Sequence, residues 1–277
     1  MSHGWNTTTL TSEAEALHAF TELRGKRWVC RGQKKSYGGL LPSIDRGPMQ
    51  NLSRHEKLML ERRSIDLFRS TARFFADQGE HDALTSDISA LMVLRHYGVP
   101  TRLLDWSTSP HVAAYFAAQE PDIEDGEIWS FNEPLYETGP GPEQWKTWRQ
   151  TTRDRSGDGP KFDATLTAFT VEEPPDWFTC NYYPAGFPRQ NAQEGAYTMT
   201  ARLGRDHAEA IAHLFGDPKQ YRLYVVRTTL KAKLRTLLRE NHGIWRGSLY
   251  PDSGGAAETA STVFPCKEVQ DCSRGIR

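Results

Sequence analysis

Cysteines and long apolar runs are both scarce in this sequence. Among its 277 residues there are four cysteines, and no stretch approaches the run of about 18 apolar residues typical of a membrane span. The cysteines form no CxxC pair and lie near no paired histidines, so the sequence does not indicate a zinc site. Its start lacks a basic segment followed by an apolar block. We therefore expect a reduced, cytoplasmic protein with no metal, no signal peptide and no membrane association.

An excess of charge of either sign is also missing. The sequence has 34 Lys and Arg against 35 Asp and Glu, a formal net charge of −1. Such a balance gives no global attraction to nucleic acid or to an anionic membrane, although it leaves room for local basic patches. The sequence also contains no P-loop, no GxGxxG after a strand, no HExxH and no GxSxG. The sequence therefore gives no support to the enzyme classes that these four motifs mark: P-loop nucleotide-binding proteins, Rossmann dinucleotide-binding enzymes, HExxH metalloproteases and α/β-hydrolases.

What the sequence does contain is a succession of helix-like and strand-like segments. Apolar residues recur at three- and four-residue steps in segments that predict helices at 11–25, 53–79, 86–98, 109–119, 207–216 and 231–243. Shorter apolar or alternating runs predict strands at 28–30, 126–132, 192–200 and 221–230. Because helices and strands do not alternate regularly, a doubly wound parallel sheet is not expected. The pattern predicts one α+β domain over residues 1–277 with a mostly antiparallel sheet.

Residues 133–160 differ in composition from the rest of the chain. They are rich in Gly, Pro, Trp and charged residues and have no clear periodicity. Such a stretch is typical of an inserted surface excursion or a lid.

An arginine and a glycine follow the first strand-like run. Arg31 comes directly after the apolar run that ends at Cys30, and Gly32 follows it. A guanidinium at a strand end offers a planar fork for phosphate or carboxylate, and a glycine permits close approach of a ligand or of backbone. The alternative is an arginine at a turn, held by a nearby carboxylate.

A second candidate is the stretch "HYGVPTRLLDWSTSPHVAAYFA". It combines aromatic rings, charges and three consecutive hydroxyl residues at the start of a predicted helix, where free N–H groups can hold an anion. The alternative is purely structural: Ser107 or Ser109 caps the helix, and Asp105 pairs with Arg102.

A third candidate is "RQNAQEGAYTM". Here Gln193 and Glu194 lead into Gly195 and a β-prone run. A carboxylate at the entry of a strand can stabilise positive charge on a sugar, whereas most single acidic residues are simply solvated.

Taken in order, these segments resemble the FRG domain family. The matching stretches are "RWVCRGQKKSYGGLLPSIDRG", "LMVLRHYGVPTRLLDWSTSPHVAAYFAA", "GEIWSFN", "RQNAQEGAYTM" and "GIWRGSLYPDSGG", a core of residues 27–257. The family is named after a Phe-Arg-Gly, which reads Cys30-Arg31-Gly32 here. Its usual "LLDWT" reads "LLDWS", and its late "LFPDLDG" reads "LYPDSGG".

The arrangement is also similar, more distantly, to ADP-ribosyltransferases of the Arg, Ser-Thr-Ser, Glu class. In that class an Arg-Gly ends the first strand, Ser-Thr-Ser precedes a helix, and a glutamate comes later on another strand. Arg31 matches the arginine, and Ser107 to Ser109 match the serine motif. Gln193 or Glu194 takes the place of the glutamate. The resemblance implies a split antiparallel sheet with flanking helices, NAD as substrate and no metal.

The resemblance also implies roles for individual residues. Arg31 holds the diphosphate or the ribose hydroxyls, Ser107 and Ser109 orient the Arg31 strand or bind the nicotinamide ribose, and Glu194 suits the catalytic carboxylate better than Gln193. Tyr97 or Trp106 is expected to stack on nicotinamide. The NAD-contacting set is Arg31, Gly32, Tyr97, Arg102, Trp106, Ser107, Thr108 and Ser109, and the catalytic set is Glu194, Gln193 and Arg31.

The acceptor of the ADP-ribose is less constrained than the donor. A toxin or antiviral effector that modifies RNA or DNA, or else a protein, is the first hypothesis, with an antitoxin as a further partner. Nucleic acid is slightly favoured because aromatic residues flank the predicted pocket. The basic stretch "KAKLRTLLRENHGIWRG" can face phosphates or simply be a solvated helix face. A non-catalytic NAD- or nucleotide-binding module and an NAD glycohydrolase are the alternatives.

Overall fold

One mixed β-sheet organises the described part of the chain. The computed structural model describes residues 4–24, 28–74, 84, 86–133, 174, 178–181 and 188–261. In these ranges the sheet has seven strands in the order β1-β7-β4-β2-β3-β6-β5. The strands are β1 (Asn6–Leu10), β2 (Trp28–Gln33), β3 (Leu104–Ser107), β4 (Gly126–Asn132), β5 (Phe178–Asn181), β6 (Gly195–Thr200) and β7 (Tyr221–Val226). Only β1 and β7 pair in parallel, so the predicted α+β class and mostly antiparallel sheet are confirmed.

The extent of strand pairing is smallest in the middle of the sheet, between β2 and β3. β2 pairs with β4 along its whole length, and β3 pairs with β6 along its whole length. Between β2 and β3, in contrast, the described residues share the single registered pair Cys30 and Ser107. The sheet therefore consists of two well-paired halves, β1-β7-β4-β2 and β3-β6-β5, which part on either side of this pair.

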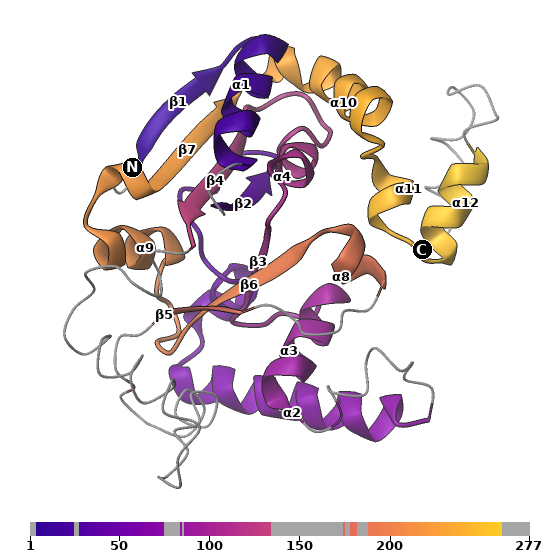
Figure 1. The fold of residues 1–277 in the computed structure, drawn as a ribbon. Helices are drawn as coiled ribbons and strands as arrows, with labels where there is room; N and C mark the ends of the chain where they lie inside the picture. Colours follow the sequence, from indigo (N-terminus) through magenta and orange to yellow (C-terminus); the bar gives the residue numbers. More distant parts are fainter. Residues whose placement is uncertain are drawn as a thin grey trace, which may run out of the picture.

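Helices cover both faces of the sheet (Figure 1). The helices of the described residues are α1 (Glu13–Arg24), α2 (Arg54–Ala72), α3 (Asp87–His96), α4 (Pro110–Ala117), α8 (Pro188–Ala192), α9 (His207–Phe215), α10 (Thr228–His242), α11 (Arg246–Leu249) and α12 (Ser253–Ser261). Apolar residues of α1, α4 and α10 form one core cluster with the sheet, and those of α3 and α9 form the other.

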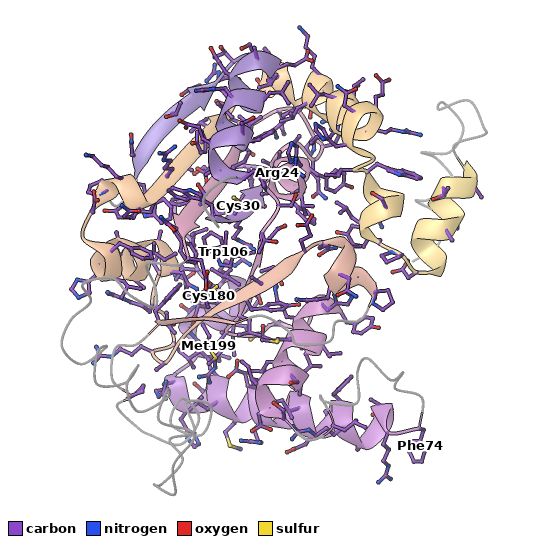
Figure 2. All side chains as sticks on the ribbon, in the orientation of Figure 1. Arg24, Cys30, Phe74, Trp106, Cys180 and Met199 are labelled. Carbon is purple, nitrogen blue, oxygen red and sulfur yellow. The ribbon has the colours of Figure 1, made fainter. Side chains whose placement is uncertain are left out.

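The alternation of side chains along β2 decides which face each residue joins. Trp28 and Cys30 belong to the cluster with α1, α4 and α10, whereas Val29 belongs to the cluster with α3 and α9. Because successive side chains of a strand point to opposite faces, Arg31 follows Val29 to the α3 side. Cys30 and Trp106 both lie in the interior between these layers (Figure 2).

Two predicted helix boundaries are wrong. The strand predicted at 221–230 ends at Val226, and α10 already begins at Thr228. Leu230 and Leu234 are buried at a helical spacing, and Asp125 accepts a hydrogen bond from the Thr228 amide at 2.8 Å, which favours the earlier start. The helix predicted at 53–79 ends at Ala72.

Two further expectations concern other parts of the chain. The insertion or lid predicted at 133–160 lies outside the described residues, apart from Glu133 at the end of β4. None of the helices described here has both the length and the apolar character needed to cross a bilayer.

Candidate functional site

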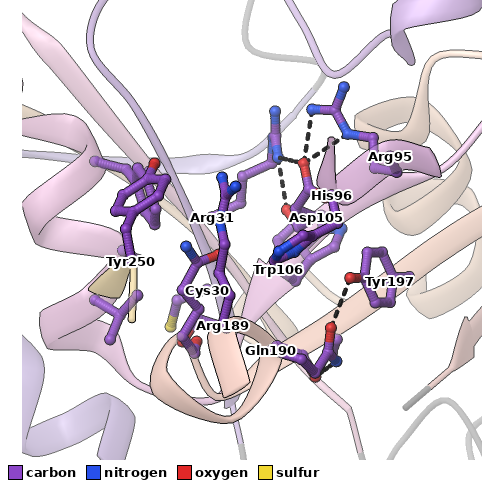
Figure 3. Close-up of a pocket in the computed structure, with 18 of the residues that line it drawn as sticks. Cys30, Arg31, Arg95, His96, Asp105, Trp106, Arg189, Gln190, Tyr197 and Tyr250 are labelled. Atoms are coloured by element: carbon purple, nitrogen blue, oxygen red, sulfur yellow. Dashed lines mark hydrogen bonds and ion pairs between the residues drawn. The ribbon is translucent and has the colours of Figure 1, made fainter. Parts of the chain in front are cut away.

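A cavity of about 310 Å³ lies where the two halves of the sheet part. Arg31 comes from β2, Asp105 and Ser107 from β3, Gln193 from the turn before β6, and Arg95 from α3. These residues are far apart in the sequence, and the pairing of β3 with both β2 and β6 brings them together. Figure 3 shows Arg31, Asp105 and Arg95 grouped on one side of the cavity and Tyr250 on the other.

Arg31 is held in the cavity by Asp105. Its Nη1 donates a hydrogen bond of 2.6 Å to the Asp105 carbonyl oxygen and lies 3.7 Å from the Asp105 carboxylate. Its Nε is buried and has no hydrogen-bond partner in the part of the chain that the structure describes. Burial lowers the pKa of Arg31 to about 10, which still leaves the guanidinium protonated near neutral pH. A buried, charged donor with unused hydrogen-bonding capacity is suited to bind an anion.

Asp105 is engaged by a second arginine. Arg95 donates from Nε at 2.8 Å and from Nη2 at 2.6 Å to one oxygen of the Asp105 carboxylate. Burial raises the pKa of Asp105, but the charges of Arg95 and Arg31 outweigh this effect and lower the pKa below its ordinary value. Asp105 therefore pairs with Arg31 and Arg95 and not with Arg102, the partner that the sequence suggested.

The three hydroxyl residues of the Ser-Thr-Ser motif have different positions. Ser107 lines the cavity, donates a hydrogen bond of 2.8 Å to the Gln193 carbonyl and accepts one from the Ser109 amide. Ser109 is buried and caps α4, because its Oγ accepts from the Val112 amide. Thr108 is exposed beside the turn at Gln193. The motif therefore combines a helix cap with one residue at the cavity.

The two candidates for the catalytic glutamate also differ in position. Gln193 lines the cavity, and its side-chain amide donates to the Leu249 carbonyl at 3.1 Å. Glu194 is exposed beside the cavity and has a φ of 45°, a left-handed conformation that is uncommon for a non-glycine residue. The Thr108 amide holds the Glu194 carbonyl at 2.9 Å, and the Thr108 hydroxyl lies 3.4 Å from the Glu194 carboxylate. Gln193 and Gly195, on either side of Glu194, both line the cavity.

The structure adds cavity residues that the sequence did not single out. Arg95 lies in the last turn of α3, Arg189 lies in the short helix α8, and Tyr250 follows α11. The Arg189 guanidinium lies 4.1 Å from the centre of the Tyr250 ring, a cation–π contact. Tyr250 belongs to "LYPDSGG", one of the quoted motif stretches, and an aromatic residue in a motif is the one signal that pointed to it.

His96 also lines the cavity. Burial and the nearby charge of Arg189 lower the pKa of His96 to about 4, so its imidazole is neutral near pH 7. It adds no charge to the cavity.

Comparison with known families bears on the first half of this site. Residues 26–126 match the FRG domain. No curated protein and no solved structure gives a significant match to the chain. The FRG match contains Arg31, Arg95, Asp105 and Ser107 and ends before Arg189, Gln193, Glu194 and Tyr250. It therefore covers the first part of the 27–257 core that the resemblance predicted, and it includes the β2 and β3 side of the cavity.

The glycine of the FRG motif serves the packing of α4. A Cβ on Gly32 would lie 1.8 Å from the Ala113 carbonyl oxygen and 2.7 Å from the Ala117 amide nitrogen. The backbone of α4 therefore approaches β2 at this residue more closely than any side chain allows. Gly32 lines the cavity as well, but this contact alone explains why a glycine is required there.

We expect Gly32→Ala to lower the free energy of unfolding by about 3 kcal/mol or more, because helix and strand backbones must move apart. Urea unfolding followed by circular dichroism measures it. Gly38→Ala is the control: it has a φ of 75° and no atom within 4 Å of an added Cβ, so it carries only the backbone cost of about 1 kcal/mol. Equal losses for the two variants would contradict the close packing of α4 on Gly32.

Three further residues of the predicted NAD-contacting set, unlike Arg31 and Ser107, either lie outside the cavity lining or are fixed in the cavity wall. Arg102 is fully buried and pairs with Glu61, with Nε 2.8 Å from the carboxylate, and it does not line the cavity. Tyr97 is 66% exposed, and its ring contacts His96 edge-on outside the cavity lining. Trp106 does line the cavity, but it is buried and its indole N–H donates to Thr198 Oγ1 at 2.7 Å.

These placements correct the interpretation of Arg102 in particular. Its guanidinium is taken up by a carboxylate in the interior and is not presented to a ligand. Trp106 is fixed by its hydrogen bond and by packing in the core, so it forms part of the wall and has little freedom to stack on a ring.

Proposed function

We propose that the protein is an NAD-dependent ADP-ribosyltransferase that binds NAD in the cavity between the two halves of the sheet. The observation that carries the proposal is the convergence of three sequence-distant groups at this point. Arg31, Ser107 and the turn at Gln193 and Glu194 meet where β2 and β3 part. The Arg, Ser-Thr-Ser, Glu pattern requires these groups to lie in one place. Had they lain on separate surfaces of the protein, the transferase proposal would have been excluded.

The charge of the cavity supports an anionic ligand such as the diphosphate of NAD. Arg31 offers a buried guanidinium with an unpartnered Nε. In the proposed reaction the bond between nicotinamide and the ribose C1′ breaks, and nicotinamide leaves with the bonding electron pair. Positive charge develops on the ribose, as in glycoside hydrolysis. A nucleophile of the acceptor then bonds to C1′ and loses its proton to a carboxylate or to water.

Glu194 is the carboxylate that we assign to this step. It makes no ion pair with another described residue, whereas Asp105 is engaged by two arginines. In the described ranges Glu194 is the one non-glycine residue with a positive φ. Such left-handed conformations often occur at functional sites. Thr108 holds the Glu194 carbonyl at 2.9 Å, which fixes the turn beside the cavity.

A macromolecular acceptor, with nucleic acid favoured over protein, fits the groups near Tyr250. Arg189 and Arg246 both contact the Tyr250 ring, and Arg239 contacts Trp245. Guanidinium and aromatic groups are the pair that single-stranded nucleic acids bind through phosphate and base stacking. Lys231 and Arg235 of the basic helix are less available, because Lys231 donates to the Lys34 carbonyl and Arg235 pairs with Asp122. A toxin or antiviral effector with this activity would require a neutralising partner.

A specific observation also favours a second candidate, a non-catalytic module that binds NAD or another nucleotide. Gln193 is among the residues that line the cavity, whereas Glu194 is not. Its amide is tied to the Leu249 carbonyl and offers no carboxylate to the ribose. In this alternative the cavity keeps its affinity for the nucleotide but lacks the group that stabilises the reacting sugar.

Incubation of the purified protein with NAD labelled in the adenylate and with cell extract tests the proposal. We expect label on a macromolecule that is sensitive to nuclease, and loss of labelling in Arg31→Ala. Label that resists nuclease and is removed by protease would move the acceptor to protein. Free ADP-ribose without acceptor labelling would indicate an NAD glycohydrolase, and no turnover with any extract would leave the binding module.

A further inference from the structure

Two arginine side chains contact the carboxylate of Asp105. Arg95 contacts it at 2.6 Å and Arg31 lies 3.7 Å away. Arg46 adds a further positive charge to this region: burial and the like charge of Arg95 lower its pKa, while the charges of Tyr37 and Asp105 oppose this effect. The Nε atoms of Arg31 and Arg46 are both buried and have no hydrogen-bond partner among the described residues. The guanidinium groups that contact Asp105 therefore outnumber its one negative charge.

The cavity as a whole has the same imbalance. Arg31, Arg95 and Arg189 line it, and Asp105 is the one acidic residue among the described residues that do so. With three positive charges and one negative charge, the described residues of the lining carry a net charge of +2. Arg31 and Arg95 have side chains only 12% and 16% exposed, whereas that of Asp105 is 41% exposed. The carboxylate thus lies on the open side of the two guanidinium groups.

We propose that Asp105 occupies the place of a ligand's anionic group, and that Arg95 together with Arg31 forms the subsite for a diphosphate. The carboxylate keeps both guanidinium groups in position while the cavity is free of ligand. A diphosphate oxygen then takes over the donors of Arg95 and the free Nε of Arg31, and Asp105 turns toward solvent. Arg95 is thereby an anion-binding residue, and Asp105 is an internal competitor that sets the affinity.

This inference deepens the proposed function, on which it rests for the identity of the ligand as NAD. The subsite itself needs only an anion with two phosphate groups. A charge of +2 in a partly buried space favours a doubly negative group over a singly negative or neutral one. Arg95 and Asp105 both line the cavity and both lie within the 26–126 stretch that matches the FRG domain.

The structural alternative is that Asp105 only braces β2, β3 and α3 through its two arginines. The two roles predict opposite changes in anion affinity when the Asp105 carboxylate is removed. A brace that is removed loosens Arg31 and Arg95, so anion affinity falls. A competitor that is removed frees both guanidinium groups, so anion affinity rises. Asn at this position keeps the shape of the side chain and one hydrogen-bond acceptor but not the charge.

Isothermal titration calorimetry with inorganic pyrophosphate on the full chain measures this sign. We expect Asp105→Asn to bind pyrophosphate about fivefold more tightly than the unmodified protein, and Arg95→Gln to bind it about tenfold more weakly. Arg62→Gln is the matched control. Arg62 also forms an ion pair with an aspartate, Asp87 of α3, at 2.9 Å, but it does not line the cavity. The Arg62→Gln protein should therefore bind pyrophosphate as tightly as the unmodified protein.

Weaker or unchanged pyrophosphate binding in a folded Asp105→Asn protein would overturn the competitor role, and unchanged binding in Arg95→Gln would overturn the subsite. If Arg95→Gln does not fold, Arg95→Lys replaces it, with an expected loss of about threefold because one charge remains without the bidentate geometry. Equal binding in Arg95→Lys and in the unmodified protein would likewise contradict the subsite.

The pyrophosphate titration tests the subsite independently of the test for NAD cleavage. Pyrophosphate contains no ribose or nicotinamide, so its binding does not depend on turnover. The expected pattern of affinities together with no NAD cleavage would keep the subsite and reject the transferase. NAD cleavage with unaltered pyrophosphate affinity in both variants would do the reverse.

Discussion

Glu194→Gln is expected to slow the release of nicotinamide from NAD by about 100-fold or more. A carboxylate beside the ribose stabilises the positive charge of the transition state and accepts the proton of the acceptor, and each of these contributions is typically worth a factor of about 100 or more. The substitution keeps the size of the side chain and removes its charge. Because Glu194 is exposed and makes no ion pair with a described residue, the free energy of unfolding should hardly change. Chromatographic measurement of nicotinamide gives the rate.

Two variants calibrate this experiment. Glu240→Gln removes an exposed carboxylate of α10 that does not line the cavity, and it should leave the rate unchanged. Gln193→Glu places a carboxylate at the neighbouring residue. If Gln193→Glu increased the rate while Glu194→Gln had no effect, position 193 and not position 194 would be the catalytic one, and our assignment would be wrong.

Arg102→Met is expected to lower the free energy of unfolding by about 3–5 kcal/mol. The Arg102 and Glu61 side chains are 1% and 0% exposed, and the Arg102 backbone amide also donates to Glu61 at 3.0 Å. Removing the guanidinium leaves a buried carboxylate without its counter-charge, which costs far more than the loss of an exposed ion pair. Urea unfolding measures the change, and Arg62→Met is the control, since its partly exposed pair with Asp87 is worth about 1 kcal/mol or less.

A double variant separates this structural role from ligand binding. Glu61→Leu combined with Arg102→Met removes both charges and should recover most of the lost stability. If Arg102 does not bind NAD, the folded double variant should keep the NAD affinity of the unmodified protein. A stable double variant with an affinity reduced tenfold would instead return Arg102 to the NAD-contacting set.

Local signals in the sequence predicted local structure well. The helix start followed from a serine before Pro110 and an apolar run, and of the two predicted caps, Ser107 and Ser109, it is Ser109 that caps α4. The strand at 126–132 followed from its apolar composition and is β4. The cap of Ser109 is a bond between residues three apart, and the apolar composition of 126–132 marks a buried strand although its partners β2 and β7 are distant in the sequence.

Elements that depend on distant partners were missed. β1 has the sequence "NTTTL", with four exposed residues and one buried leucine, so no apolar alternation marks it. It becomes a strand because β7, more than 200 residues later, supplies the parallel hydrogen-bonding partner. The earlier start of α10 likewise depends on Asp125, which lies in a loop of another segment.

The same distinction applies to the candidate site. The resemblance to the Arg, Ser-Thr-Ser, Glu pattern predicted that Arg31, Ser107 and Glu194 line one cleft. The structure brings Arg31 and Ser107 into one cavity and places Glu194 exposed beside it. The pairing of Asp105 was not predictable, because Arg102 is closer in the sequence while Arg95 and Arg31 are closer in space. Arg102 prefers Glu61, a partner 41 residues away on α2. Charge pairs in the interior are decided by packing, which the sequence spacing does not encode.

The most direct test of the account is a calorimetric titration of NAD into Glu194→Gln protein, in which turnover is suppressed, with and without Arg31→Ala. We predict one NAD bound per chain and an affinity at least about tenfold weaker when Arg31 is replaced. Arg62→Ala in the same background should leave the affinity unchanged. Absence of NAD binding, or an affinity that does not depend on Arg31, would contradict the claim that the cavity between the two halves of the sheet is the NAD site.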